Sequence, residues 1–379
     1  MSLQLIQNWV PGIKWPIICN APMIGAASPA LAVAVTRAGG LGFIESSTDI
    51  SKGSKQLDKL TSDLEKCSSL LDGRVGNTYL PIGISFITGH QSVGSFAETA
   101  VPIISRHAPA AVWLFAPDGE VKPHGSVVSA LEPLDRRPAV FVQVGNVRAA
   151  REAARDGADV IVCQGTDAGG HQFRAGMGVI SLVPSVRRML AAEFPDRKVA
   201  VLAAGGIVNG DGVAAAMALG ATGVVMGTRF TVSDESIYPE HRKQKILAAS
   251  DGGSETFKSP FHDQVRKNTL WGELYDGRAI ISPVHERYMA GASLEECQKS
   301  LEDDYSPEEA TKVISTWAYV QDAIQTFTRV LIDTDFFFLF LLVSGTGVGM
   351  VDKAEPAGDI VSEVRDEAID IIRKLGESL

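Results

Sequence analysis

The chain is poor in cysteine, has no surplus of positive charge and contains no apolar segment long enough to span a membrane. Its four cysteines lie far apart, without a C-x-x-C pair or a metal-like spacing, so we predict no metal site and a reducing compartment. A formal net charge of −10 argues against nucleic acid or an anionic membrane surface as the main partner. No basic stretch followed by an apolar core is visible near residue 1, so we expect a cytoplasmic protein.

One apolar run stands out near the C-terminus. Residues 336–343 (FFFLFLLV) are eight in number, against roughly 20 for a bilayer span, which favours a buried strand or helix face over a membrane segment. Two explanations stay open for residues 330–343, a genuine insertion or an error in the gene model. A genuine insertion that packs poorly would expose a large apolar patch.

Short apolar runs alternate with amphipathic stretches over the first 230 residues. Several runs are continuously apolar, as expected of strands covered on both faces, and the alternation with short links predicts a parallel sheet. Eight such strands fit a closed (β/α)8 TIM barrel better than an open sheet. The expected strands are 16–20, 41–44, 80–86, 111–115, 139–144, 160–164, 199–203 and 223–226.

The alternation stops after residue 230, and three segments are expected to follow the barrel of residues 1–230. Residues 231–330 look helical and loop-rich, including a helix over 307–329, and predict an insertion after the eighth strand that forms a lid over the barrel mouth. Residues 331–355 hold the atypical apolar stretch and a glycine-rich loop. Residues 356–379 carry apolar side chains on one helical face, which suits a last helix closing the outer ring.

Glycines gather where two consecutive strands are expected to end. Gly205 and Gly206 follow one strand, and Gly227 with Thr228 follows the next. Such turns leave bare backbone N–H groups, and the loops after the seventh and eighth strands of a barrel often build one phosphate site. The alternative is a pair of tight turns without a ligand, but their repetition at consecutive strand ends favours phosphate binding.

A histidine follows two glycines at the end of an earlier strand. The stretch QGTDAGGH, residues 164–171, begins on the barrel face where active sites lie. Imidazole is suited to proton transfer near neutral pH, so His171 is a candidate catalytic residue as well as a possible structural histidine. At the end of the first strand, Ala21, Pro22 and Met23 offer small side chains and proline against which an aromatic ring system can lie.

Taken together, these stretches resemble the nitronate monooxygenase family, formerly called 2-nitropropane dioxygenases, which are FMN-binding TIM barrels. Residues 271–278 resemble the insertion of the fungal branch, and GTGVG at 345–349 resembles the stretch before the family's last helix. Related flavin barrels, including FMN-dependent enoyl reductases, share the Gly-Gly-His motif. The other matching pieces occur in the family's order: APM at 21–23, AGGLG at 38–42, QGTDAGGH at 164–171, AAGGI at 203–207 and MGTRF at 226–230.

The resemblance implies a reaction and a set of site residues. The enzyme would use FMN and dioxygen to oxidise nitronates or nitroalkanes, and His171 would remove the α-proton of a nitroalkane or orient the nitronate. Ser85 stands where many family members have asparagine, so it is carried over as a substrate contact of shorter reach. The implied cofactor contacts are Ala21, Pro22, Met23, Gln164, Gly169, Gly205, Gly206, Met226, Gly227 and Thr228.

Three other functions fit the same residues. An FMN-dependent NAD(P)H reductase of quinones or enoyl groups would use the same barrel, although the sequence has no G-x-G-x-x-G turn on a separate domain. A non-catalytic or misfolded product would follow if residues 330–343 disrupt packing. A phosphosugar barrel without flavin would be active but colourless. The physiological substrate and the oligomeric state do not follow from the sequence.

Overall fold

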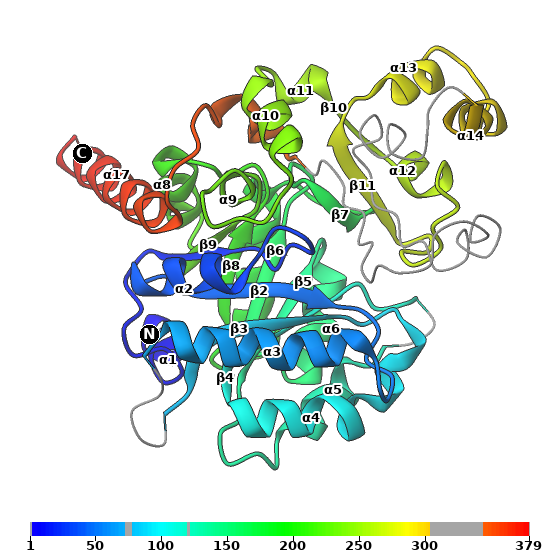
Figure 1. Cartoon of the computed structure of the whole chain (residues 1–379). Coiled ribbons are helices and arrows are strands. Elements are labelled where there is room, and N and C mark those ends of the chain that lie inside the picture. The colour runs from blue at the N-terminus through cyan, green and yellow to red at the C-terminus, as the bar shows by residue number, and fades with distance from the viewer. Residues whose placement is uncertain (1, 73–77, 120–121, 304–343, 379) are drawn as a thin grey trace.

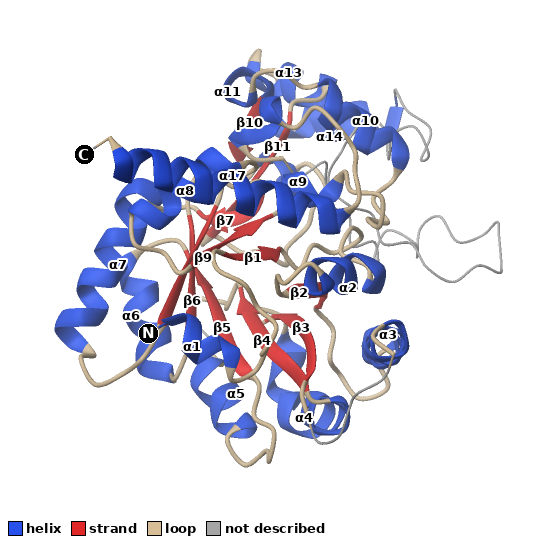
Figure 2. Ribbon diagram, turned by 90° about the vertical axis from the view of Figure 1, so that its left-hand side faces the viewer, coloured by secondary structure: helices blue, strands red, loops and turns tan. Residues whose placement is uncertain are grey.

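Eight parallel strands close into a barrel in the part of the chain that the computed structural model describes, residues 2–72, 78–119, 122–303 and 344–378. They form one sheet in the order β1-β9-β8-β6-β5-β4-β3-β2, and a parallel bridge between Cys19 and Leu41 joins the two ends (Figure 2). The predicted TIM barrel is therefore confirmed. The strands are β1 Ile17–Asn20, β2 Gly42–Ser47, β3 Leu80–Ile87, β4 Pro109–Phe115, β5 Ala139–Val144, β6 Val160–Gln164, β8 Ala200–Ala204 and β9 Gly223–Met226.

Helices surround the barrel, one after each strand. The last of them, α17, follows the insertion and packs against α8 and α2, which completes the ring. Local sequence sets several of the helix ends. Ser28 accepts a hydrogen bond from the Leu31 N–H at the start of α2, for example, and Gly157 ends α6 at a φ of 106°. The ring helices are α2 Pro29–Arg37, α3 Lys55–Leu70, α4 Phe96–His107, α5 His124–Leu131, α6 Val147–Asp156, α7 Val179–Glu193, α8 Gly210–Ala218 and α17 Ala357–Glu377.

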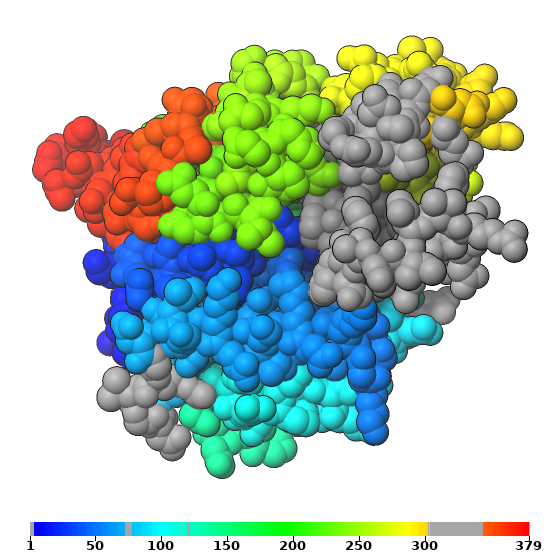
Figure 3. All heavy atoms as spheres, in the orientation of Figure 1, coloured from blue at the N-terminus to red at the C-terminus, as the bar shows by residue number. Residues whose placement is uncertain are grey.

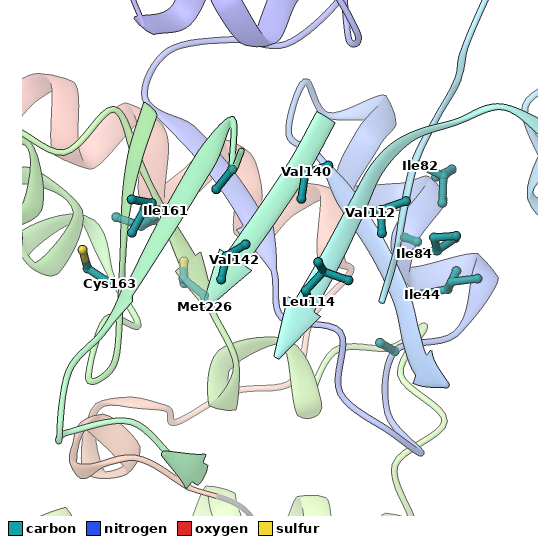
Figure 4. Close-up of a cluster of buried hydrophobic side chains, with 14 of the residues drawn as sticks. Ile44, Ile82, Ile84, Val112, Leu114, Val140, Val142, Ile161, Cys163 and Met226 are labelled. Carbon is teal, nitrogen blue, oxygen red and sulfur yellow. The ribbon is translucent and has the colours of Figure 1, made fainter. Parts of the chain in front are cut away.

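Side chains on the strands alternate between two apolar layers. One set points outward against the helices; Figure 4 shows Ile82, Val112, Val140 and Ile161 among them. The other set fills the barrel interior, where the ring of Phe43 lies 5.2 Å from that of Trp113. Gly83 faces the same interior, and a Cβ there would lie 2.2 Å from the Phe43 ring, so glycine at this position makes room for the aromatic core.

The two ends of the barrel differ. At the amino ends of the strands, α1 (Ser2–Gln7) and the turn after it contribute Ile6, Val10 and Ile13 to the interior core. These side chains close that end of the cylinder. All eight strands run in the same direction, so their carboxyl ends share the opposite rim, where TIM barrels carry their active sites.

The insertion after β9 contributes both short helices and strands. Its strands β10 and β11 pair with β7, which follows β6 directly, in a three-stranded antiparallel sheet with the order β10-β11-β7. Figures 1 and 3 show residues 231–303, in green to yellow, at one end of the molecule. Its elements are α9 Thr228–Thr231, α10 Glu240–Ala248, α11 Gly252–Glu255, β10 Thr256–Ser259, α12 Phe261–Gln264, β11 Tyr275–Ile280, α13 Pro283–Met289 and α14 Leu294–Asp303, with β7 spanning Gly170–Phe173.

Two expectations concern segments outside the described residues: the helix over 307–329 and the apolar run 336–343. The chain resumes with Ser344 and a 3-10 helix, η2, of residues Thr346–Met350. A second 3-10 helix, η1, spans Gln91–Ser95 before α4. Over the described ranges, every helix is too short or too polar to cross a bilayer.

Candidate active site

A cavity opens at the carboxyl rim of the barrel. Including the part open to solvent, it measures about 630 Å³. The strands contribute the side chains of Trp113, Gln143 and Gln164. Ala204 and Val225 at the ends of β8 and β9 also line it, and the loops after β1, β6, β8 and β9 contribute most of the rest, together with Gly345 and Gly347 ahead of the last helix. Segments from almost the whole length of the chain therefore meet around one space.

Most of the cofactor contacts expected from the sequence line this cavity. Met226 instead points outward into the layer between strands and helices (Figure 4), and its carbonyl accepts the Ala21 N–H at 2.9 Å. Met226 thus holds the loop after β1 in place through its backbone. The expected residues that line the cavity are Ala21, Met23, Gln164, Gly169, Gly205, Gly206, Gly227 and Thr228.

Ser85 and Pro22 lie beside this cavity and are not among its lining residues. The Ser85 hydroxyl is fully buried and lies 2.8 Å from that of Ser46. Ser46 in turn donates to the Pro22 carbonyl at 2.9 Å. This chain of hydrogen bonds joins β3, β2 and the loop after β1, so Ser85 stabilises the rim at the place where the sequence predicted a substrate contact.

Three glycine-rich loops pack backbone to backbone along one wall of the cavity. Gly205 has a φ of 107°, and a Cβ there would lie 2.8 Å from the Gly165 carbonyl oxygen. A Cβ on Gly345 would lie 2.5 Å from the carbonyl oxygen of Asp167, and the Gly345 N–H donates to the Thr228 hydroxyl at 3.1 Å. Side chains are excluded here, so the wall presents bare main chain, as a phosphate or a flat ring requires.

Two glutamines line the cavity, and the side-chain oxygen of one of them has no hydrogen-bond donor within the described ranges. Gln143 Oε1 accepts from the Trp113 indole N–H at 3.2 Å. Gln164 Nε2 donates to the backbone carbonyl of His171 at 3.0 Å. The other end of that amide, Gln164 Oε1, is buried and has no hydrogen-bond partner within the described ranges. Because a buried acceptor without a donor costs about 1–3 kcal/mol, this oxygen points to a ligand that donates a hydrogen bond.

His171 lies on β7 at the same rim, close to the cavity but outside its lining. Its side chain is 1 % exposed, and its Nε2 lies 2.8 Å from Asp263 Oδ2. The imidazole stacks on the Trp271 ring, with centroids 3.7 Å apart and planes 9° from parallel. Gln164, which does line the cavity, donates a hydrogen bond to the His171 carbonyl, and Gly169, which also lines the cavity, lies two residues before His171. The Asp263 carboxylate therefore holds one edge of the imidazole ring, and the Trp271 ring covers one of its faces.

The insertion supplies most of the surroundings of His171. β11 pairs with β7 so that Gly277 lies opposite His171. Trp271 belongs to the interior core of the barrel, 6.1 Å from the ring of Phe115, and Tyr275 lies 5.5 Å from the same ring. The insertion and the barrel interior thus form one continuous aromatic wall beside the imidazole.

Other titratable groups near the rim are held neutral by burial. Burial lowers the pKa of His262 to about 4 and that of His285 to about 3, and their rings share a 2.7 Å hydrogen bond. Burial raises the pKa of the Cys163 thiol on β6, so a thiolate nucleophile is disfavoured there. Burial and the nearby Asp118 also raise the pKa of the Tyr275 phenol.

Sequence reasoning missed several residues of this site. Asp263 and Trp271 contact His171 from positions about a hundred residues away. No local pattern marks Asp263, and Trp271 is marked only by the resemblance of residues 271–278 to the fungal insertion. Trp113 and Gln143 sit on expected strands, but the continuously apolar pattern of these strands does not show which side chains face the cavity. Gly345 and Gly347 lie in a stretch that was noted only for its resemblance to the family.

The closed barrel and its glycine-walled cavity define a TIM-barrel enzyme with its site at the carboxyl rim. The family model "Nitronate monooxygenase" matches residues 10–367. The chain belongs to the nitronate monooxygenase family, whose members are flavin enzymes, and it is an oxidoreductase.

Named relatives agree with this assignment, and solved structures share the fold. A nitronate monooxygenase of Neurospora crassa is 42 % identical over 99 % of this chain and 94 % of its own. Nitronate monooxygenase npaC of Metarhizium robertsii is 34 % identical over 96 % and 94 %. FabK from Thermotoga maritima, 24 % identical, has a TM-score of 0.67 over 99 % of this chain and 98 % of its own, which supports the fold. The nitroalkane oxidase from Streptomyces ansochromogenes, 21 % identical, has a TM-score of 0.66 over 98 % and 99 %.

Proposed function

We propose that the chain binds FMN in the rim cavity and uses dioxygen to oxidise nitronates, and nitroalkanes after His171 has removed their α-proton. The observation that carries this proposal is the placement of Gln164. Its side chain lines the cavity, its amide nitrogen is fixed on the His171 carbonyl, and its buried oxygen lacks a donor within the described ranges. One residue thereby connects the cavity to the strand that carries the imidazole.

The residues around the cavity fit a flavin mononucleotide. Gly205, Gly206, Gly227 and Thr228 would hold the phosphate with main-chain N–H groups and a hydroxyl, because the glycine backbone leaves the close approach that an anion needs. Ala21 and Met23 would lie against the ring system. Gln164 Oε1 would accept a hydrogen bond from the ring, which resolves its missing partner.

These positions indicate which part of the chemistry the cofactor would supply and which part the chain would supply. FMN, when bound, supplies the electron transfer between substrate and dioxygen. The chain supplies binding, the exclusion of water and a base. For a neutral nitroalkane, the C–H bond at the α-carbon breaks, the proton moves to the His171 imidazole, and the bonding electrons stay on the substrate, which becomes the nitronate anion to be oxidised. A nitronate offered directly needs no base.

Two measurements on purified protein test the proposal. The released cofactor is identified by chromatography, and oxygen uptake is followed with ethylnitronate and with nitroethane. We expect FMN and oxygen uptake with ethylnitronate. In H171N we expect bound FMN and ethylnitronate turnover to persist. Its kcat/KM for nitroethane should fall by roughly 10²–10⁴-fold, the usual contribution of a positioned general base.

Several results would overturn the proposal. Protein purified without flavin that does not take up FMN would contradict the assignment of the cavity. Bound FMN that NADH or NADPH bleaches under anaerobic conditions, with no oxygen uptake on ethylnitronate, would favour the reductase of quinones or enoyl groups. Unchanged nitroethane turnover in H171N would remove the base from His171.

A further inference from the structure

The carboxylate of Asp263 meets the imidazole of His171 from the insertion. Asp263 lies on α12, and its Oδ2 is 2.8 Å from His171 Nε2. The two side chains are 12 % and 1 % exposed, so water screens the contact little. The contact joins the strand after β6 to a helix that begins 90 residues further along the chain.

Asp263 is itself held in position by a second residue. Asn268 Nδ2 donates to the other carboxylate oxygen, Asp263 Oδ1, at 3.0 Å, and the Asn268 N–H donates to the Asp263 carbonyl at 2.9 Å. The Asn268 amide is oriented in turn, because its Oδ1 accepts from the Leu270 N–H at 3.1 Å. The carboxylate therefore has one oxygen tied to the insertion and the other aimed at His171.

This geometry decides which nitrogen of His171 carries the proton. An ionised carboxylate only accepts hydrogen bonds, so Nε2 must donate, and the neutral ring keeps its lone pair on Nδ1. Stacking on Trp271 fixes the plane of the ring. A base with a fixed tautomer and plane does not have to reorient before it takes a proton.

The neighbours of His171 on α12, β11 and β6 other than Asp263 carry no charge near pH 7. From α12, the titratable neighbours are Asp263 and His262, and burial holds the pKa of His262 at about 4, so His262 stays neutral near pH 7. From β11, the residue opposite His171 is Gly277, which has no side chain. From β6, Gln164 is uncharged and contacts the backbone of His171.

We propose that Asp263 is a positioning residue for proton abstraction: it sets the Nε2–H tautomer of His171 and stabilises the imidazolium that forms when Nδ1 takes the α-proton of a nitroalkane. The inference rests on the proposed function, in which His171 is the base. The step conserves charge, because a neutral nitroalkane and a neutral imidazole become a nitronate anion and an imidazolium cation beside a carboxylate. Asn268 supports the same arrangement one hydrogen bond further away.

The test compares wild type with D263N on two substrates. The asparagine keeps the shape of the side chain and removes its charge, so the imidazolium loses its partner and the tautomer is no longer fixed. For nitroethane we expect kcat/KM to fall by at least about 10²-fold, as for loss of the orienting acid in other base–acid pairs. For ethylnitronate, which needs no base, we expect a change below about threefold, with flavin content unchanged.

The tautomer of His171 gives a readout that a merely structural role does not move. In ¹⁵N-histidine spectra of the protein, with the His171 signals assigned by their loss in H171N, wild type should show the Nε2–H tautomer.

Two further variants extend the test: N268A is a weaker perturbation of the same carboxylate, and D276N is a control. N268A leaves the carboxylate but frees one of its oxygens, so it should reduce nitroethane turnover in the same direction and by less than D263N. D276N removes another buried carboxylate of the same sheet, one that pairs with Arg174 and Lys258 at 2.8 and 3.1 Å. It should leave the ratio of the two substrates unchanged.

The outcomes separate this inference from the proposed function. Equal losses on both substrates in D263N, or an Nδ1–H tautomer of His171 in wild type, would overturn the role of Asp263 while the flavin chemistry stands. Wild type that oxidises ethylnitronate but not nitroethane would also overturn it, since no proton is then abstracted. Absence of flavin and of ethylnitronate turnover in wild type would instead remove the proposed function itself.

Discussion

A side chain at Gly227 should displace the flavin without disturbing the fold. Gly227 follows β9 with a φ of −102°, a value open to any residue. A Cβ built there would lie 3.7 Å from Met23 Sδ and 4.0 Å from the Ala21 Cβ, so the protein has room for it. The new methyl group would occupy the cavity. G227A therefore tests the assignment of this wall with little risk to folding.

The expected magnitudes differ between the empty and the loaded protein. Without flavin, the free energy of unfolding should stay within about 0.5 kcal/mol of wild type, or rise slightly, because alanine restricts the unfolded chain. With flavin, an added methyl in a close-packed site typically costs about 1–3 kcal/mol. Since about 1.4 kcal/mol is a factor of ten, the Kd for FMN should rise roughly 5–150-fold, and further in G227V.

The assay titrates flavin-free protein with FMN and follows quenching of flavin fluorescence. G206A provides the contrast, because Gly206 has a φ of 72° and its Cβ would lie 3.1 Å from that of Asp167, so this variant should lose stability as well as affinity. Gly12 is a matched control with open space around its Cβ, and G12A should bind like wild type. A wild-type Kd in G227V would show that the phosphate lies elsewhere.

Two further predictions concern stability. Arg365 on α17 donates to the carbonyls of Ala38 and Gly39 at 2.9 and 3.0 Å. R365A should therefore lower the thermal midpoint by an amount corresponding to roughly 3 kcal/mol. R373A, which loses an exposed ion pair, should change the thermal midpoint little. Burial lowers the pKa of His262 to about 4, so between pH 6.5 and 4 the unfolded chain binds more protons than the folded chain. The thermal midpoint should therefore fall as the pH is lowered from 6.5 to 4. A thermal midpoint that stays constant over that range would contradict a neutral buried imidazole.

Much of the barrel was predictable because its strands are local and continuously apolar. The runs 139–144, 160–164 and 223–226 match β5, β6 and β9 at both ends. Each is covered on both faces, so burial alone selects its residues, and turn or cap residues mark its ends. The rim was predictable for a related reason: a glycine after such a strand can only lie at the carboxyl edge.

The insertion was not predictable in the same way. Residues 256–259 and 275–280 were expected to be helical or looped, yet they form β10 and β11. Tyr275–Ile280 mixes charged, small and apolar residues and shows no clear alternation. Its strand conformation comes from hydrogen bonds with β7, a hundred residues earlier, so it depends on pairing that no local pattern contains.

The remaining differences between the site expected from the sequence and the observed site come from the direction in which single side chains point. Neighbouring residues of a strand face opposite sides, so Val225 borders the cavity while Met226 packs against the helices. The family motif MGTRF begins at Met226 and does not include Val225. For Asp263 the sequence gives no signal, because its role arises only where α12 meets β7.

The two layers around His171 have different parts in the proposed chemistry. The barrel holds the glycine-walled cavity, and through Gln164 it fixes the backbone that carries the imidazole. The insertion contributes Asp263 and Trp271, which fix the ring itself. Substitutions in the insertion can therefore change the strength of the base while the cofactor wall stays intact, and substitutions in the glycine loops can do the reverse. Relatives with the same glycine motifs but a different insertion should then bind flavin alike and differ in the ratio of nitroalkane to nitronate turnover.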